Sequence, residues 1–271
     1  MKNDMIRNDR KRPTGRITFA LAALALLAVA LLPANGESIY TTRFESPTFT
    51  AGQPLVGQDG WVVGNGPCGP FNPDAAVIST DKPRQGKQSV RVAGADLIGS
   101  CTDLAPYDAV GSYRKPLNVS VAGSVARVEA NLRLETNQSV TPDEFFSLTI
   151  SARSGDGETL GEIGLSSAGV VEAFDFDVAP GSAPAFTDPI QFNQWYHITI
   201  LIDFANRTTS YFIDDHFLGT IDTPSASDVL LRASMIVYAR PDGDSQRADY
   251  TAHFDNFKVK VVAGSNDDDG D

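Results

Sequence analysis

Polar residues at every second position form the pattern in this sequence with the clearest chemical potential. The polar members are Arg127, Glu129, Asn131 and Arg133, and the residues between them are Val128, Ala130 and Leu132, followed by Leu134. Successive side chains of a β-strand point to opposite faces, so this period predicts one buried face and one solvated face. Charged and amide groups in such a row can hydrogen-bond sugar hydroxyls, although an ordinary solvated sheet face explains the pattern equally well.

A sugar-binding surface normally also needs an exposed aromatic ring that stacks on the sugar. Trp61 and Trp195 are the main candidates, and Tyr107 and Tyr113 are further ones. Tryptophan is highly buried on average, so packing in the core is the competing explanation for both Trp61 and Trp195.

Residues that could carry catalysis lack the required arrangement. Asp175 and Asp177 would share one face of a strand, but Glu172 would lie on the opposite face, so no carboxylate triad forms there. Proton transfer needs a base and an acid, and the candidates are His197 with Tyr113, Tyr211 or Tyr250. A histidine tolerated on a half-buried strand explains His197 more simply. The sequence favours a domain without catalytic activity.

Strand patterns extend through the whole chain after its first 36 residues. Their ranges are 38–45, 89–93, 128–135, 145–152, 195–204, 208–213, 229–239 and 250–262. Turn residues separate them, and no window outside the N-terminus shows a helical period of 3.6 residues. The pattern predicts an all-β, two-sheet antiparallel sandwich that forms one domain over residues 37–263.

The first 36 residues have the parts of an export signal. A basic stretch precedes an unbroken apolar run over residues 17–32, and the small residues Ala34 and Gly36 follow. Sixteen helical residues would span roughly 24 Å, less than the ~30 Å of a bilayer core. We therefore expect a signal peptide over residues 1–36 that is cleaved after Gly36, with cleavage after Ala34 as the second choice and an uncleaved membrane anchor as the alternative. The protein would be secreted, periplasmic or at the cell surface.

The basic residues of the predicted signal make the whole chain look less acidic than its mature part. The signal contains six of the 22 basic residues but only two of the 34 acidic ones, so the mature chain would carry a net charge of −16. Such a surface repels phosphate groups, which argues against nucleic acid and, after cleavage, against anionic membranes as partners. Residues 264–271 predict a short, disordered acidic tail.

Two cysteines, Cys68 and Cys101, lie in the part expected to be exported. An even pair in an oxidising compartment predicts a disulfide. Two residues alone are too few for a zinc site.

The segment over residues 193–221 resembles the central strands of the concanavalin A-like, laminin-G-like jelly rolls. Trp195 opens an apolar alternation, Asn206 and Arg207 occupy a turn, and Asp214-Asp215-His216 form a hairpin where the family usually has Asp-Gly or Asn-Gly. The segments over residues 44–61 and 254–259 resemble terminal strands of exported bacterial jelly rolls. The resemblance implies a jelly-roll fold whose first and last strands pair, and it leaves function open because lectins, glycanases and lyases share this fold.

The resemblance also implies positions for ions and catalytic groups. Related binding modules hold structural Ca²⁺ between a first-strand Glu and a last-strand Asp, which correspond to Glu45 and Asp255. Other oxygens would have to complete the six to eight ligands. The Glu-x-Asp-x-x-Glu motif of the glycosidases is absent, and Arg127-Val128-Glu129 matches only half of the Arg-x-Glu-Leu-Arg strand of the lyases.

The sequence therefore predicts an exported carbohydrate-binding or surface-interaction domain whose partner is a polysaccharide or cell-surface glycan. A polysaccharide lyase or glycoside hydrolase is one alternative, and it requires Arg127, Glu129 and His197 to converge on one face. A structural envelope or matrix protein is the other alternative.

Overall fold

The structure, a computed structural model, describes residues 36–66, 69–97, 109–137, 146–174, 186–223, 225–239 and 249–263. β-Strands dominate these ranges, and the single helical segment within them is the 3-10 turn η1, Gly94–Asp96. None of the described helices is long and apolar enough to cross a membrane. The all-β prediction is confirmed.

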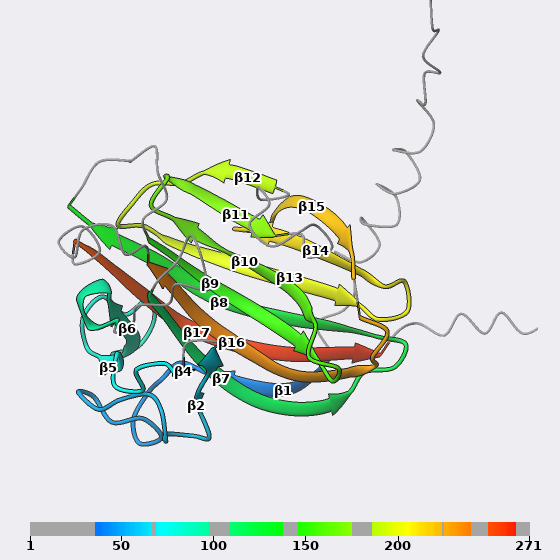
Figure 1. Ribbon diagram of the computed structural model, residues 1–271, viewed down its shortest axis with the longest axis horizontal. Coiled ribbons are helices and arrows are strands. Elements are labelled where there is room, and N and C mark those ends of the chain that lie inside the picture. Colours follow the sequence, from blue (N-terminus) through cyan, green and yellow to red (C-terminus); the bar gives the residue numbers. More distant parts are fainter. Residues whose placement is uncertain are drawn as a thin grey trace, which may run out of the picture. The chain divides into compact units, whose positions relative to one another are not determined.

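Two large antiparallel sheets form the described domain (Figure 1). Sheet A contains β1 (Glu37–Thr42), β5 (Ala76–Ser79), β6 (Ser89–Ala93), β8 (Ser124–Thr136), β13 (Trp195–Asp203), β14 (Thr208–Ile213), β15 (His216–Asp222) and β17 (Tyr250–Ala263). Sheet B contains β2 (Val62–Val63), β7 (Ala109–Ser120), β9 (Phe146–Ser154), β10 (Thr159–Ser166), β11 (Val170–Phe174), β12 (Phe186–Pro189) and β16 (Val229–Ala239). A short ribbon pairs β3 (Asn65–Gly66) with β4 (Gly69–Pro70). The predicted two-sheet sandwich is confirmed.

The strand order places the long strand β8 at the centre of sheet A. Sheet A runs β15-β14-β13-β8-β17-β6-β5, and sheet B runs β12-β11-β10-β9-β16-β7-β2. β1 pairs with β17, so the first and last strands are neighbours, as expected from the sequence (Figure 1). The pairing of β17 with β8 shifts at a bulge between Asp255 and Lys258, where Asn256 has φ +52°.

The β13–β14–β15 meander matches the segment that resembles the jelly rolls. β13 and β14 are joined by a turn that contains Asn206 and Arg207, as predicted. β14 and β15 are joined by Asp214 and Asp215, whose φ angles are +47° and +64°. Positive φ at both central residues is what a type I′ hairpin requires, so this chain forms the hairpin of the family without its usual glycine.

The core lies between the sheets because one face of each strand is apolar. Val128 and Leu132 of β8 and Ile200 of β13 point inward from sheet A, and Ile150 and Ile163 point inward from sheet B, all fully buried. Burial of one such side chain contributes roughly 1.5–3 kcal/mol relative to exposure. The alternate residues therefore occupy the outer faces of the sandwich, and these faces carry the polar groups considered below.

Several sequence predictions fall outside the described residues. They concern residues 1–35 of the expected signal, Cys68 and Cys101, Tyr107, Asp175 and Asp177, and the acidic tail over residues 264–271. Signal cleavage, the disulfide and the tail stay predictions.

Candidate functional site

The predicted polar stripe lies on the outer face of β8, in the middle of sheet A. Glu129 is opposite Thr199 of β13 and Lys258 of β17. Asn131 is opposite His197. The strand pairings thus bring the predicted residues together with polar partners from two neighbouring strands, and we refer to this surface as the Glu129 stripe.

Glu129 is the centre of an ion cluster in the Glu129 stripe. Its Oε1 lies 2.6 Å from Arg127 Nη2 and 3.4 Å from His197 Nε2. Burial alone would raise the pKa of Glu129, but the hydrogen bond from His197 and the charges of Arg127, His197 and Lys258 outweigh it and lower the pKa to about 2. Glu129 is therefore ionised at neutral pH and already has its counter-charges.

The prediction of a fully solvated face is wrong for the centre of this stripe. Glu129 is 5% exposed and Asn131 is 8% exposed. β8 has neighbours along both edges, and His197 of β13 contacts Glu129 while Lys258 of β17 lies opposite it. Arg127 and Arg133 are half-buried, so the stripe is accessible mainly at its ends.

Trp195 lies at one end of the Glu129 stripe and is half-buried. Its ring meets that of His253 edge-on, with 6.3 Å between the centroids. His253 Nε2 lies 2.8 Å from Glu135 Oε2, and Arg133 donates to the carbonyl of Asn193. These contacts lie beside the Glu129 cluster, and they leave Arg133 Nε and His253 Nδ1 buried without a hydrogen-bond partner among the described residues.

Trp61 is not available to a ligand, contrary to the candidate role given to it from the sequence. It is 1% exposed, and its ring packs edge-on against Phe257 at 5.2 Å and against Tyr40 at 6.2 Å. Its indole N–H donates to the Tyr40 hydroxyl at 2.9 Å. An aromatic residue with its polar atom satisfied inside the protein belongs to the core.

An aromatic pair with one exposed ring, which the sequence did not single out, lies at the β14–β15 hairpin. The rings of Phe212 and Phe217 are 5.4 Å apart, and Phe217 is 39% exposed. Phe212 is opposite Thr199, so it shares a face with the Glu129 stripe. Only strand pairing reveals this neighbourhood, because Phe212 and Glu129 are far apart in the sequence.

Glu45 and Asp255, the predicted calcium ligands, meet at the loop that precedes β6. Asp255 Oδ2 accepts the backbone N–H groups of Arg84 and Gln85 at 2.8 and 3.0 Å. Glu45 Oε1 accepts those of Lys87 and Gln88 at 2.6 and 3.0 Å. Burial raises the pKa of Asp255, these N–H donors lower it, and the nearby Glu45 charge raises it.

These contacts give Glu45 and Asp255 a structural role in fixing the loop. Among the described residues no group of three or more His, Cys, Asp or Glu side chains is arranged to hold a metal ion. Backbone carbonyls would therefore have to supply most ligands of a calcium ion. Calcium binding stays a prediction.

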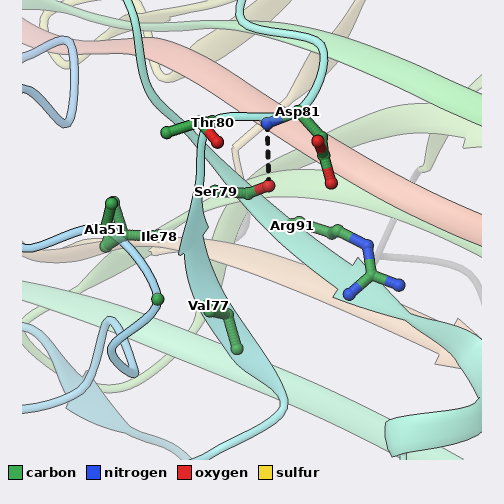
Figure 2. Close-up of a pocket in the computed structure, with 8 residues that line it drawn as sticks. Ala51, Val77, Ile78, Ser79, Thr80, Asp81 and Arg91 are labelled. Atoms are coloured by element: carbon green, nitrogen blue, oxygen red, sulfur yellow. Dashed lines mark hydrogen bonds between the residues drawn. The ribbon is translucent and has the colours of Figure 1, made fainter.

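A shallow pocket lies at the β5 edge of sheet A. Its walls include Val77 and Ser79 of β5 and Arg91 of β6, with Asp81 at the rim, whose N–H donates to Ser79 Oγ at 3.0 Å (Figure 2). Its volume is about 180 Å³. Sites for drug-sized ligands are usually about 300–1,000 Å³, and no aromatic ring lines this one, so we do not assign it a ligand.

The outer face of sheet B carries a different kind of polar surface. Small hydroxyl residues of β9, namely Ser147, Thr149 and Ser151, face outward and are 1–2% exposed. Above them, Glu162 of β10 and Tyr238 of β16 meet across β9, with the Tyr238 hydroxyl donating to Glu162 Oε1 at 2.8 Å. This bridge explains why the hydroxyls are buried, and we call the surface the Glu162 face.

Glu162 is protonated more readily than an ordinary glutamate. Burial raises its pKa, and the hydrogen bonds from Tyr238 and Thr149 and the charge of Arg153 oppose that effect only in part. The Thr149 hydroxyl donates to Glu162 Oε1 at 2.9 Å. A carboxyl group perturbed by burial among fixed hydroxyls is typical of a functional site.

Other groups of the Glu162 face support the same interpretation. Ser147 Oγ is buried and has no hydrogen-bond partner within the described ranges. Glu172 of β11 lies diagonal to Glu162, because Glu162 is opposite Phe174 and Gly164 is opposite Glu172. Two carboxyl groups and a half-buried aromatic ring, Phe174, therefore gather on one face.

The lyase arrangement considered from the sequence forms only in part. Arg127, Glu129 and His197 do converge on one face, as that hypothesis requires. Tyr113, Tyr211 and Tyr250, however, are 0–1% exposed in the core. None of these tyrosines can supply a proton to a ligand on the Glu129 stripe.

Solved structures similar to this chain include an endo-1,3-beta-glucanase from Streptomyces sioyaensis, with a TM-score of 0.55, 9% identity and coverage of 86% of this chain and 98% of the glucanase. The conserved carbohydrate esterase from Shiga toxin-encoding bacteriophage phi24B has a TM-score of 0.53, 12% identity and coverage of 83% and 99%. The carbohydrate recognition domain of Emp47p has a TM-score of 0.50, 7% identity and coverage of 84% and 98%.

The chain has the concanavalin A-like jelly-roll fold. A sialidase also matches 77% of this jelly roll with a TM-score of 0.46 and 10% identity, but the jelly roll spans only 17% of that chain. No protein-family model matches the sequence, and no curated protein matches it. At these identities the comparisons establish the fold of the jelly roll and leave its ligand to be inferred from its own residues.

Proposed function

We propose that this jelly roll binds a carbohydrate chain on the Glu162 face. The observation that carries the proposal is Glu162 itself, a buried carboxyl held by Tyr238 and Thr149 above a row of small hydroxyl groups. Sugars are recognised by fixed donors and acceptors that lie beside apolar rings. Phe174 and Tyr238 supply rings at the two sides of Glu162.

The central carboxyl groups of both faces are buried, and the Glu129 stripe supports this proposal less well because Glu129 contacts charged Arg127 whereas Glu162 is held by hydroxyl groups. The central carboxylate of the stripe already contacts Arg127 and His197, and its second carboxylate, Glu135, contacts His253. A ligand would have to break these internal contacts, and the energy lost with them would offset the energy gained from its own contacts. Trp195 nevertheless makes the stripe the alternative binding face, and variants there are the matched controls.

Glycoside hydrolysis is the second candidate function, and the Glu162–Glu172 pair favours it. Diagonal residues on neighbouring strands are roughly 7–8 Å apart, a spacing from which two carboxyl groups can flank one glycosidic bond. The raised pKa of Glu162 would suit a general acid. Under this candidate, Glu162→Gln abolishes release of reducing ends while the variant still binds the chain.

Binding is tested on a glycan array with the full chain, with and without EDTA. We expect wild type to bind a polysaccharide, and we expect Glu162→Gln or Tyr238→Phe to weaken binding about tenfold through loss of one hydrogen bond to a charged or polar group. Trp195→Ala and Arg127→Met should bind like wild type. The opposite result for the two sets would place the ligand on the Glu129 stripe, and binding to no glycan would refute the proposal.

Export and the disulfide belong to the same proposal, because a glycan-binding surface of this kind would act outside the cell. Mass spectrometry of the mature chain is the measurement for both. We expect a chain that begins at Glu37 and is two hydrogens lighter than the reduced form, which would reflect a Cys68–Cys101 bond. A full-length mass in the membrane fraction would favour the uncleaved anchor.

A further inference from the structure

Three arginines lie together at one end of the Glu162 face. Arg153 of β9 is directly opposite Arg232 of β16, and Arg114 of β7 is opposite Ser234, one diagonal step from Arg232. All three side chains are half-buried. Strand pairing therefore concentrates three positive charges on a protein whose formal net charge is −12.

The three arginines repel one another, and the pKa values of two of them reflect this repulsion together with burial. Burial and the charges of Arg114 and Arg153 lower the pKa of Arg232 to about 10. Burial and the charge of Arg153 lower the pKa of Arg114 as well. Like charges directly opposite each other destabilise a sheet, so this arrangement has a cost in the unliganded protein.

Among the described residues, Arg153 and Arg232 leave much of their hydrogen-bonding capacity unused. Arg153 Nη1 donates to the carbonyl of Gly157 at 2.9 Å. None of the ion pairs between described residues involves Arg153 or Arg232, and Arg232 Nε is buried without a hydrogen-bond partner in those ranges. Arg114 packs over the backbone of Gly64, where an added Cβ would lie 2.6 Å from Arg114 Nε. The guanidinium of Arg114 thus lies close to Gly64.

We propose that Arg114, Arg153 and Arg232 bind the anionic group of an acidic sugar whose chain lies on the Glu162 face. A guanidinium presents paired N–H donors that match the oxygens of a carboxylate or a sulfate ester. The neighbouring carboxyl, Glu162, does not repel such a group when it is protonated. This inference rests on the proposed function and names the substrate class of the same site.

The acidity of the whole protein does not exclude an anionic ligand at this cluster. Charges farther away than about 8 Å are largely screened at physiological ionic strength, whereas the arginines would contact the ligand directly. A local basic cluster on an acidic protein therefore selects a short charged segment of a chain rather than any polyanion.

The test compares polygalacturonate, which carries carboxylates, with its methyl-esterified form, which is neutral, by isothermal titration calorimetry on the full chain. We expect the acidic chain to bind at least about tenfold more tightly, since charge-assisted hydrogen bonds to two arginines distinguish the two chains. The double variant Arg153→Met, Arg232→Met should lose this preference and bind the ester as wild type does. The control double variant Arg43→Met, Arg84→Met removes two exposed arginines and should keep the preference.

Other outcomes separate this inference from the proposed function. Equal affinity of wild type for the two chains, with both weakened by Tyr238→Phe, would overturn the acidic-sugar inference and leave carbohydrate binding intact. Failure to bind either chain or a sulfated one would overturn the acidic-sugar inference alone, whereas binding to no glycan on the array would overturn both. Tighter binding of dextran sulfate than of dextran, lost in the Arg153→Met, Arg232→Met variant, would support the inference with a sulfate ester as the anionic group. The single variant Arg232→Lys keeps the positive charge and controls for misfolding of the double variant. It should retain part of the preference for the acidic chain.

Discussion

The protonation of His253 gives a quantitative prediction about stability. Its side chain is 1% exposed, and burial lowers its pKa to about 4, although Glu135 raises it and the charges of Arg133 and Arg91 lower it further. The unfolded chain binds this proton near the ordinary pKa of 6.5. As the pH falls from about 6.5 to about 4, the unfolded state therefore gains a proton that the folded state does not, and stability decreases. A shift of this size corresponds to about 3 kcal/mol.

The perturbation is His253→Gln, which keeps a donor for Glu135 but does not titrate. Urea unfolding between about pH 7 and about pH 4 should show that wild type loses about 3 kcal/mol more than the variant across this range. Carboxyl groups that do not contact His253 cancel in the difference, and Glu135 is the one carboxyl paired with it among the described residues. His216→Gln is the control, because the His216 side chain is 71% exposed, and it should follow the wild-type curve. Parallel curves for wild type and His253→Gln would refute the argument.

Three further predictions concern single positions. Gly86→Ala should destabilise the protein by about 2 kcal/mol in urea unfolding, because the new Cβ would lie 2.1 Å from Glu45 Oε1 and the residue has φ +77°. The control is Gly52→Ala, which has φ +78° but open space around it, and it should lose only the backbone cost of about 1 kcal/mol. Equal losses would contradict this. Asp215→Gly should stabilise the β14–β15 hairpin by roughly 0.5–1 kcal/mol, since glycine adopts φ +64° without strain, and an unchanged Tm would argue against the type I′ turn. Added Ca²⁺ should raise the Tm of EDTA-treated protein by about 3 °C per kcal/mol of binding energy, by relieving the repulsion between Glu45 and Asp255, and Asp255→Asn should abolish the effect. An unchanged Tm would contradict calcium binding, and the backbone N–H groups would then be the partners of both carboxylates.

The fold could be predicted because its signals are local. Alternation over residues 128–135 identified a strand with an inward apolar face, and that strand is β8. The resemblance over residues 193–221 gave the β13–β14–β15 meander with its turns. Pairing of β1 with β17 also followed from the resemblance.

The site could be predicted only in part, because it depends on which strands are neighbours. The sequence located Arg127 and Glu129 on one face, but it did not show that His197 contacts Glu129 or that Glu129 is buried. It discounted Glu172 because the residues around it on the same strand have the wrong period. The partner of Glu172 is Glu162 of β10, and Arg153 meets Arg232 in the same way across strands. Each of these pairs is set by cross-strand register, which has no signature within either strand.

The most direct test of the account compares the affinities of three proteins for one bound polysaccharide: wild type, a variant of the Glu162 face and a variant of the Glu129 stripe. Tyr238→Phe removes only the hydroxyl that donates to Glu162, and Trp195→Ala removes the ring at the end of the stripe. The account predicts an increase in Kd of about tenfold for Tyr238→Phe and no change for Trp195→Ala. An unchanged Kd for Tyr238→Phe together with a large increase for Trp195→Ala would contradict it.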